Sequence, residues 1–252
     1  MALISYIQRV GPAQIGAHLI ASNRVRNLLA PCRRGVVHIC NLYTLRTSAA
    51  EVAAHFGIAN CVASNAGEDV YPGAPGVVVR EADGQRIAQS MTWGFPLRLK
   101  TMAPTAKPKP VNNIADLTKP MWKGLALKPK SRCLIPLTAF AEAEGQKGRK
   151  TRTWFSVVDQ PIFAWAGLWR DSAEWGPVYS GVMTDCNEAI RPVHDRMPVL
   201  LHAGEWDDWL HGSFDDALTL QARCFPDHLI AMERTSEPWL KRKDLMITPA
   251  LI

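Results

Sequence analysis

The sequence predicts an α+β fold, a single domain built on a mainly antiparallel β-sheet or barrel with short flanking helices. Short runs rich in β-branched and aromatic residues outnumber the helical segments. These runs follow one another through turn residues without intervening helices, which favours antiparallel pairing over alternating strands and helices. With 252 residues, 47% of them hydrophobic, the chain can bury one sizeable core.

The first predicted element is a short helix over residues 48–56. Ser48-Ala-Ala-Glu51 is a capping box, in which each of the two side chains accepts a hydrogen bond from a backbone N–H of the other residue. Apolar residues follow the box, and Gly57 can adopt the left-handed conformation that ends a helix.

Six short predicted strands come next, bounded by turn residues. The first two are separated by Asp83-Gly84, which predicts a tight hairpin turn. Four prolines and four basic residues then predict a basic, extended loop over residues 96–110. The six strands are residues 76–81, 86–94, 133–137, 153–158, 162–169 and 178–184.

Two helices are predicted near the end of the chain, over residues 203–211 and 213–223. Ser213 with Asp216 caps the second of them. The chain has neither an internal repeat nor a linker that would indicate two domains, so one domain is predicted over residues 40–240.

Residues 1–39 differ in composition from the rest. They hold five arginines and no acidic residue, the first acid being Glu51. A targeting segment, a removable pro-segment and upstream sequence from a misplaced start all fit, although no signal-peptide layout is present. We expect an N-terminal extension that is absent from the working protein, and a C-terminal tail over residues 241–252.

Charge is distributed unevenly along the chain, whose formal net charge is +6. Residues 98–152 carry thirteen Lys or Arg against three acids, whereas residues 185–237 carry eleven acids against four arginines. A basic flank beside an acidic one can orient on a nucleic-acid backbone, but an uneven solvated surface explains the pattern equally well.

The six cysteines contain no Cys-x-x-Cys pair. Such scattered spacing favours reduced intracellular thiols over a disulfide framework. His38-x-Cys40 is too weak a pattern to indicate zinc. We therefore expect no metal and no cofactor, and the lack of a long apolar run predicts no membrane span.

Five segments recur in an order that resembles a known family. The resemblance covers roughly residues 40–235 and is to the SRAP family, the SOS-response-associated peptidases whose members crosslink to abasic DNA. It implies covalent capture of abasic sites in single-stranded DNA, as part of DNA repair. The segments are CNLYTL (40–45), YPGAPGVVV (71–79), SMTWGFP (90–96), RCLIPLTAFAEAEG (132–145) and PVHDRMPVLL (192–201).

The resemblance implies that Cys40 is the nucleophile, provided that it becomes the first residue. An α-amine has a pKa of about 8, so a useful fraction is an uncharged nucleophile at neutral pH. The amine condenses with the aldehyde of an opened abasic sugar, and the thiol closes the imine into a thiazolidine ring. Self-processing at Ile39–Cys40, or translation starting near Cys40, would expose this amine. From residue type alone, a buried structural thiol would be the commoner role.

Glu142, in Phe140-Ala141-Glu142, matches the family's active-site glutamate. An unpaired carboxylate in an apolar stretch is costly, which favours its protonated form and suits it to carry protons during imine formation. A salt-bridged strand residue is the alternative, because Glu144 shares its strand parity.

His194, in His194-Asp-Arg-Met-Pro, matches the family histidine, which could assist opening of the sugar. His202 lacks the motif and is expected to be structural. Asn113 matches the family asparagine that orients the amine or the sugar, with Asn112 as the neighbouring register.

An aromatic segment resembles the family's wedge, which could stack on bases beside the lesion at about 1–3 kcal/mol per base. A buried core tryptophan is the alternative. The segment consists of Trp93, Gly94, Phe95 and Pro96.

Three positions depart from the family pattern. Ala115 and Leu42 stand where arginines are usual, and Met183 stands where a threonine is usual. These changes bear on DNA binding, and nearby lysines are expected to compensate. The lysines are Lys107, Lys109, Lys119 and Lys123.

Three functions therefore remain open. The first is an abasic-site crosslinking enzyme, working as a monomer on single-stranded DNA in the cytoplasm, at the nucleoid. The second is a thiol peptidase acting in trans through Cys40, Glu142 and His194. The third is a non-enzymatic DNA-binding domain.

Overall fold

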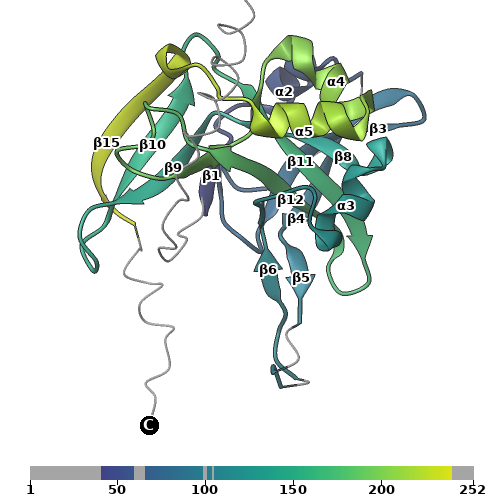
Figure 1. The fold of residues 1–252 in the computed structure, drawn as a ribbon, viewed down its shortest axis with the longest axis horizontal. Coiled ribbons are helices and arrows are strands. Elements are labelled where there is room, and N and C mark those ends of the chain that lie inside the picture. The colour runs from purple at the N-terminus through teal and green to yellow at the C-terminus, as the bar shows by residue number, and fades with distance from the viewer. Residues whose placement is uncertain (1–40, 60–65, 99–100, 104, 240–252) are drawn as a thin grey trace, which may run out of the picture. The chain divides into compact units, whose positions relative to one another are not determined.

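Two large β-sheets, a two-stranded ribbon and four α-helices are the main elements in the described part of the computed structural model (Figure 1). The described residues are 41–59, 66–98, 101–103 and 105–239. The predicted extension over residues 1–39, Cys40 and the predicted tail over residues 241–252 lie outside them. All of the described residues belong to one of the two units of the chain, the unit His38–Ile252.

The first sheet has five antiparallel strands in the order β15-β10-β9-β1-β2. Its central strand β9 follows the Cys-Leu-Ile-Pro-Leu strand after a single residue, so the apolar run 133–144 forms two strands instead of one. The bounds are β15 Ile230–Pro238, β10 Thr151–Val157, β9 Ala139–Glu144, β1 Leu42–Thr44 and β2 Asp69–Val70.

The second sheet runs in the order β13-β12-β4-β3-β8-β11-β14, and β7 also pairs with β12. A further pairing of β11 with β12 closes strands β12, β4, β3, β8 and β11 into a barrel. Only the β12–β4 and β12–β7 pairs are parallel among the described strands. The predicted antiparallel sheet or barrel is confirmed. The bounds are β13 Arg196–Pro198, β12 Gly176–Asp185, β4 Gln85–Trp93, β3 Pro75–Ala82, β8 Arg132–Leu137, β11 Phe163–Ser172, β14 Leu200–Leu201 and β7 Asn113–Ile114.

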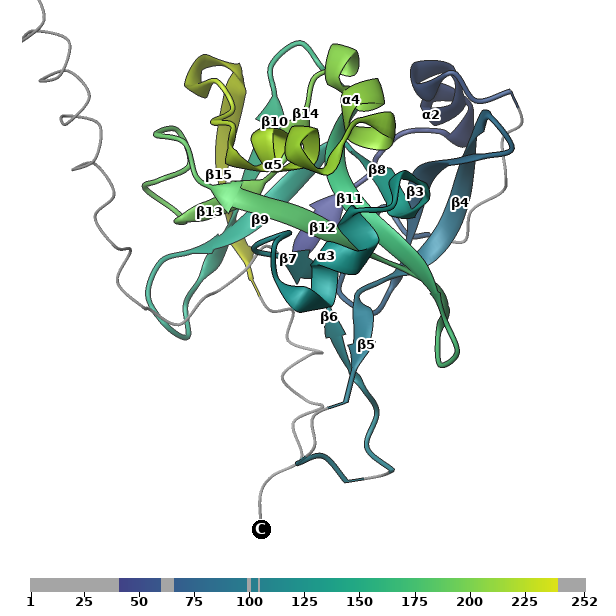
Figure 2. The ribbon, with the colours of Figure 1, turned by 45° about the vertical axis from the view of Figure 1, so that its right-hand side comes forward.

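A two-stranded ribbon extends away from both sheets (Figures 1 and 2). It consists of β5 (Phe95–Leu97) and β6 (Lys109–Val111), with Pro96 opposite Pro110. The basic, extended loop predicted over residues 96–110 is therefore correct in its middle and wrong at its ends, which pair as short strands. Proline is tolerated there because a free ribbon has only edge strands.

The predicted first helix is confirmed as α2 (Ala49–Phe56). The Ser48 hydroxyl accepts the Glu51 N–H, and Gly57 ends the helix with a φ of 67°. The two late helices are confirmed as α4 (Trp206–His211), preceded by a 3-10 turn over Ala203–Glu205, and α5 (Phe214–Ala222).

The sequence did not predict helix α3 (Pro120–Ala126), the 3-10 turns over Pro129–Ser131 and Asp227–Leu229, or strand β15. Helix α3 has only seven residues and includes Gly124. Strand β15 is mostly exposed, so it lacks the apolar alternation that identifies a strand.

Two apolar clusters hold these elements together. One lies between the two sheets and includes Tyr43, Phe140 and Phe155 from the first sheet and Trp93 and Trp165 from the second. The other joins the opposite face of the barrel strands to the helices. The candidate site lies where the paired strands β1 and β9 cover the first of these clusters.

One buried cation, Arg132, holds the three helices α3, α4 and α5 together by hydrogen bonds. The Arg132 side chain is fully buried, and its guanidinium donates to four backbone carbonyls of α3, α4 and the start of α5. Burial lowers the pKa of this guanidinium, which still stays charged near neutral pH. The carbonyls belong to Ala126, Trp209, Gly212 and Ser213.

Candidate functional site

Glu142 lies on β9 with only 1% of its surface exposed. It has the same strand parity as Phe140, so both side chains face the cluster between the sheets. Strand β1 pairs antiparallel with β9 with Leu42 opposite Ala141. Continued by one residue, this register places Asn41 opposite Glu142. The start of β1 and the buried carboxylate are therefore neighbours.

His194 lies on the turn before β13 and faces Glu142. Its Nε2 atom is 3.9 Å from Oε2 of Glu142, and the side chain is 8% exposed. That distance is too long for a hydrogen bond, and the two groups form an ion pair only when the imidazole is protonated. The turn is held by the Asn187 side chain, which accepts the Ile190 N–H and donates to the Phe225 carbonyl.

The other imidazole nitrogen of His194 faces both backbone polar groups of Arg196. Nδ1 lies 3.0 Å from the Arg196 nitrogen and 3.0 Å from the Arg196 oxygen. An unprotonated Nδ1 can accept the N–H, and a protonated Nδ1 can donate to the carbonyl. The ring therefore keeps a backbone partner in either tautomer, as a proton carrier requires.

Asn113 faces the same interior as Glu142. It lies on β7 opposite Gly181 of β12, and directly paired strand residues point to the same face. Gly181 faces Trp165, whose ring leaves no room for a Cβ at that position. Asn113 is 8% exposed, and the neighbouring Asn112 donates from Nδ2 to Oδ1 of Asn41 over 3.1 Å.

The structure thus brings Glu142 and His194 together, and it places Asn113 directly after Asn112, whose side chain contacts Asn41. Cys40, the predicted nucleophile, lies outside the described residues, and Asn41 is its bonded neighbour. Two residues at this place were not predicted to matter: Asn41, and Asn112 in its own right. The only signal in the sequence was their closeness to Cys40 and Asn113.

The aromatic segment is corrected by the structure. The rings of Trp93 and Phe95 are almost fully buried, at 0% and 2% exposure, so they have no free face on which a base could stack. Gly94 is also buried, with a φ of 116° and its N–H donated to Tyr179. Pro96 is only partly exposed, on the ribbon. The alternative of a core tryptophan is correct for Trp93.

The four lysines are all exposed. Lys107 and Lys109 lie on or beside the ribbon, and Lys119 and Lys123 lie at helix α3. Lys119 pairs with Asp116 at 3.4 Å. A hydrogen bond from the Thr118 hydroxyl lowers the pKa of the Asp116 carboxyl, which therefore stays charged.

The two comparison residues have structural partners. Glu144 accepts from Nε of Arg234 at 2.9 Å and from the Thr153 hydroxyl at 2.5 Å. His202 stacks on Phe225, with ring centroids 4.8 Å apart, and helps to cap the turn before α4. Neither side chain has Glu142 or His194 as a partner in these contacts.

Two of the three departures from the family pattern line one hollow of about 310 Å³, together with Arg196. These are Ala115, whose carbonyl accepts from Nη2 of Arg196 at 2.9 Å, and Met183. Leu42 instead packs against Ala141 and Trp154 on the outer face of the first sheet.

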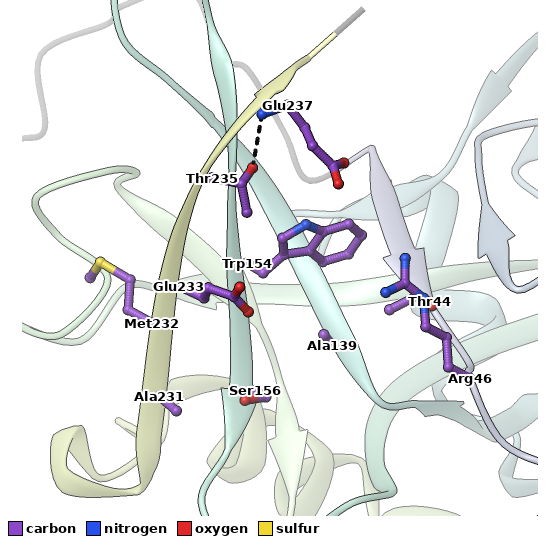
Figure 3. A pocket seen from close by; sticks show the side chains of 10 residues that line it. All are labelled: Thr44, Arg46, Ala139, Trp154, Ser156, Ala231, Met232, Glu233, Thr235 and Glu237. Atoms are coloured by element: carbon purple, nitrogen blue, oxygen red, sulfur yellow. Dashed lines mark hydrogen bonds between the residues drawn. The ribbon is translucent and has the colours of Figure 1, made fainter. Parts of the chain in front are cut away.

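A second hollow, of about 300 Å³, lies on that outer face (Figure 3). Figure 3 shows Trp154 between Arg46 and Glu233, with Ala139 and Ser156 below. Trp154 pairs with Ala141, one residue from Glu142, so the indole and the carboxylate point to opposite faces. This hollow is therefore separate from the candidate site.

Among the described residues, no three His, Cys, Asp or Glu side chains form a group that could hold a metal ion. The described cysteines Cys133, Cys186 and Cys224 are free thiols, and burial raises the pKa of Cys133 and Cys186. Within the same residues, no helix has the length and apolar character needed to cross a bilayer.

Comparison with known proteins gives a consistent result. The family model of the SOS response associated peptidase (SRAP) matches residues 39–236. The abasic site processing protein YoqW of Bacillus subtilis (strain 168) is 25% identical over 206 residues, covering 75% of this chain and 87% of YoqW. The abasic site processing protein YoaM of the same organism is 24% identical over 204 residues, covering 75% and 86%.

Solved structures share the fold. A crystal structure of a protein from Bordetella bronchiseptica has a TM-score of 0.65 at 21% identity, covering 78% of this chain and 99% of that one. Another, from Bacteroides thetaiotaomicron, has a TM-score of 0.64 at 20% identity, covering 83% and 96%.

Proposed function

This chain belongs to the SOS response associated peptidase (SRAP) family, and from that premise we propose that it captures abasic sites in single-stranded DNA covalently through Cys40. The relatives named as abasic site processing proteins support the substrate. One observation carries the proposal: buried Glu142 faces partly buried His194 at 3.9 Å, beside the start of β1. The protein acts as a monomer on DNA at the nucleoid.

In the proposed reaction, the Cys40 amine attacks the aldehyde of the opened sugar to give a carbinolamine. Loss of water forms an imine, and the Cys40 thiol then adds across the C=N bond to close a thiazolidine. The carbinolamine oxygen must gain a proton and the amine must lose protons, and Glu142 carries these between the two. The buried carboxylate suits this role because little water competes for its proton.

His194 assists opening of the sugar ring by giving a proton to the ring oxygen and taking one from the sugar hydroxyl. Its two tautomers both find a partner on the Arg196 backbone, so the proton can change sides without turning the ring. Asn113 orients the amine or the sugar through its side-chain amide.

Cys40 has a reactive amine only when it is the first residue. We propose that residues 1–39 are absent from the working protein, either because the Ile39–Cys40 bond is hydrolysed by the same residues or because translation starts near Cys40. The family match, which begins at residue 39, supports this boundary.

The experiment compares two forms of the protein, the full chain and one beginning at Cys40. Each is mixed with a single-stranded oligonucleotide carrying one abasic site, and denaturing electrophoresis reports a covalent complex. We expect a shifted band from the form beginning at Cys40, lost on Cys40→Ala. A tetrahydrofuran analogue of the abasic site should give no band, because it cannot open to an aldehyde.

Other outcomes contradict the proposal. Crosslinking by the full chain, with intact mass showing that residues 1–39 are still attached, excludes the thiazolidine mechanism. If neither form gives a band, although thermal-unfolding curves show that both are folded, the protein is a non-enzymatic DNA-binding domain. Cleavage of a peptide in trans without any crosslink would instead indicate a thiol peptidase.

A further inference from the structure

The residue that follows Cys40 is tied to a neighbouring segment by a side-chain hydrogen bond. Asn112 donates from Nδ2 to Oδ1 of Asn41 over 3.1 Å. Asn41 is bonded to Cys40 and leads into β1, whereas Asn112 directly precedes Asn113. One contact therefore links the start of β1 to the segment that carries the site asparagine.

Asn112 is itself held by two hydrogen bonds to its backbone oxygen. The indole Nε1 of Trp93 donates to it over 3.0 Å, and the Gly181 N–H donates to it over 3.1 Å. Gly181 lies on the long strand β12 of the barrel. The amide that contacts Asn41 thus projects from a backbone position fixed by two other segments.

Trp93 connects this position back to β1. Its fully buried ring packs edge-on against Tyr43, with centroids 5.1 Å apart, and against Trp165 at 5.9 Å. Tyr43 is two residues after Asn41. Trp93, Asn112, Asn41 and Tyr43 are therefore linked by a closed ring of contacts, which hold β1 by ring packing at Tyr43 and by a side-chain amide at Asn41, the residue before the strand.

We infer that Asn112 and Trp93 are positioning residues, which hold the start of β1 so that the Cys40 amine meets Glu142 and His194. This inference rests on the proposed function. The Asn112 contact, at 3.1 Å between two side chains, opposes a shift of Asn41 along or away from β9. Position matters here because the rates of reactions between bound groups fall steeply with small displacements.

A buried Trp93 fits this role. Its indole acts on the site by its hydrogen bond to the Asn112 carbonyl, and it needs no contact with DNA. A purely structural Trp93 and Asn112 would affect stability and leave the reaction unchanged, so the two cases differ in what they predict for the crosslinking rate of folded protein.

The test is a double-mutant cycle on the single-turnover crosslinking rate, in whichever form of the protein gives the crosslink. Asn41→Ala and Asn112→Ala should each slow crosslinking about fivefold, which corresponds to loss of one ordinary hydrogen bond. The double variant should be no slower than either single variant, because both remove the same contact. Asn41→Asp keeps an acceptor for Asn112 and should restore most of the rate.

Trp93→Phe has a matched control in Trp165→Phe. Both rings are fully buried, and both donate an indole N–H to a backbone carbonyl, Trp93 to Asn112 and Trp165 to Val182 at 2.7 Å. For equal changes in Tm, Trp93→Phe should slow crosslinking more than Trp165→Phe does.

Three outcomes overturn the inference while leaving the proposed function intact. These are wild-type rates in both asparagine variants, multiplicative losses in the double variant, and equal slowing by the two tryptophan variants at equal Tm. Absence of a crosslink in the wild-type protein is a separate result, because it removes the proposed function itself.

Discussion

Two regions of this molecule each bury an ionisable side chain, and the two side chains have different kinds of partner. On the helical side, Arg132 is surrounded by four backbone carbonyls whose positions are set by α3, α4 and α5. On β9, Glu142 faces the imidazole of His194, which can itself gain or lose a proton. Both side chains are 1% exposed.

The difference lies in the partners. Carbonyl oxygens cannot titrate, so the region around Arg132 has one stable charge state and serves as a fixed joint between helices. The Glu142 carboxyl instead faces an imidazole, a group that can both accept and donate a proton, which is what proton transfer requires. Burial alone therefore does not distinguish a structural charge from a chemical one, whereas the titratability of its partners does.

The largest expected effect is on the helical side. Arg132→Met should lower the free energy of unfolding by about 3–5 kcal/mol, because it leaves four buried carbonyls without their donor. Urea denaturation followed by circular dichroism measures this. An unchanged unfolding midpoint would show that the guanidinium is not the joint between the helices.

The second prediction concerns β9. Glu142→Gln should slow crosslinking about 100-fold or more, because the amide cannot carry a proton, while Tm stays the same or rises. Single-turnover kinetics with an abasic oligonucleotide give the rate.

Glu144→Gln is the matched control for this prediction. It lies on the same strand with the same parity but is engaged by Arg234 and Thr153. Its crosslinking rate should stay close to that of the wild type. If the two variants lose the rate equally, Glu142 does not act as the proton carrier.

The smallest effect concerns charges outside the core. Replacing Lys107, Lys109, Lys119 and Lys123 by Ala should weaken DNA binding and lower its salt dependence. The slope of log K against log salt should fall by about 0.7 for each lysine that contacts a phosphate. Fluorescence anisotropy of Cys40→Ala protein with labelled single-stranded DNA measures it. Lys147→Ala, in the exposed β9–β10 turn, is the control and should leave the slope unchanged.

Much of the fold could be predicted because its signals are local. The Ser48 and Ser213 caps, the Asp83-Gly84 turn and the alternating strands each specify their own element within a few residues. Helix α3 and strand β15 depend on packing against distant segments, so short-range patterns did not reveal them.

The candidate site likewise has residues that a local motif identifies and others that only distant packing defines. Motifs identified Glu142, His194 and Asn113, and the structure places the first two against each other, but the chemical roles of all three stay predictions. The resemblance to the family's wedge implied that Trp93 and Phe95 stack on bases, whereas both rings are buried, and burial depends on which strands surround a ring. The Asn41–Asn112 contact joins residues 71 positions apart, and no pattern in the sequence marks such a pair.

The residues of the site are also synthesised in a fixed order. Cys40 leaves the ribosome long before Glu142, and His194 follows about fifty residues later still. Because the facing pair belongs to strand β9 and to the turn before β13, a nascent chain that stops short of that turn has no complete proton-carrying machinery. On the proposed function, self-processing therefore waits for synthesis of nearly the whole domain, and unfinished chains keep their cysteine unreactive toward DNA.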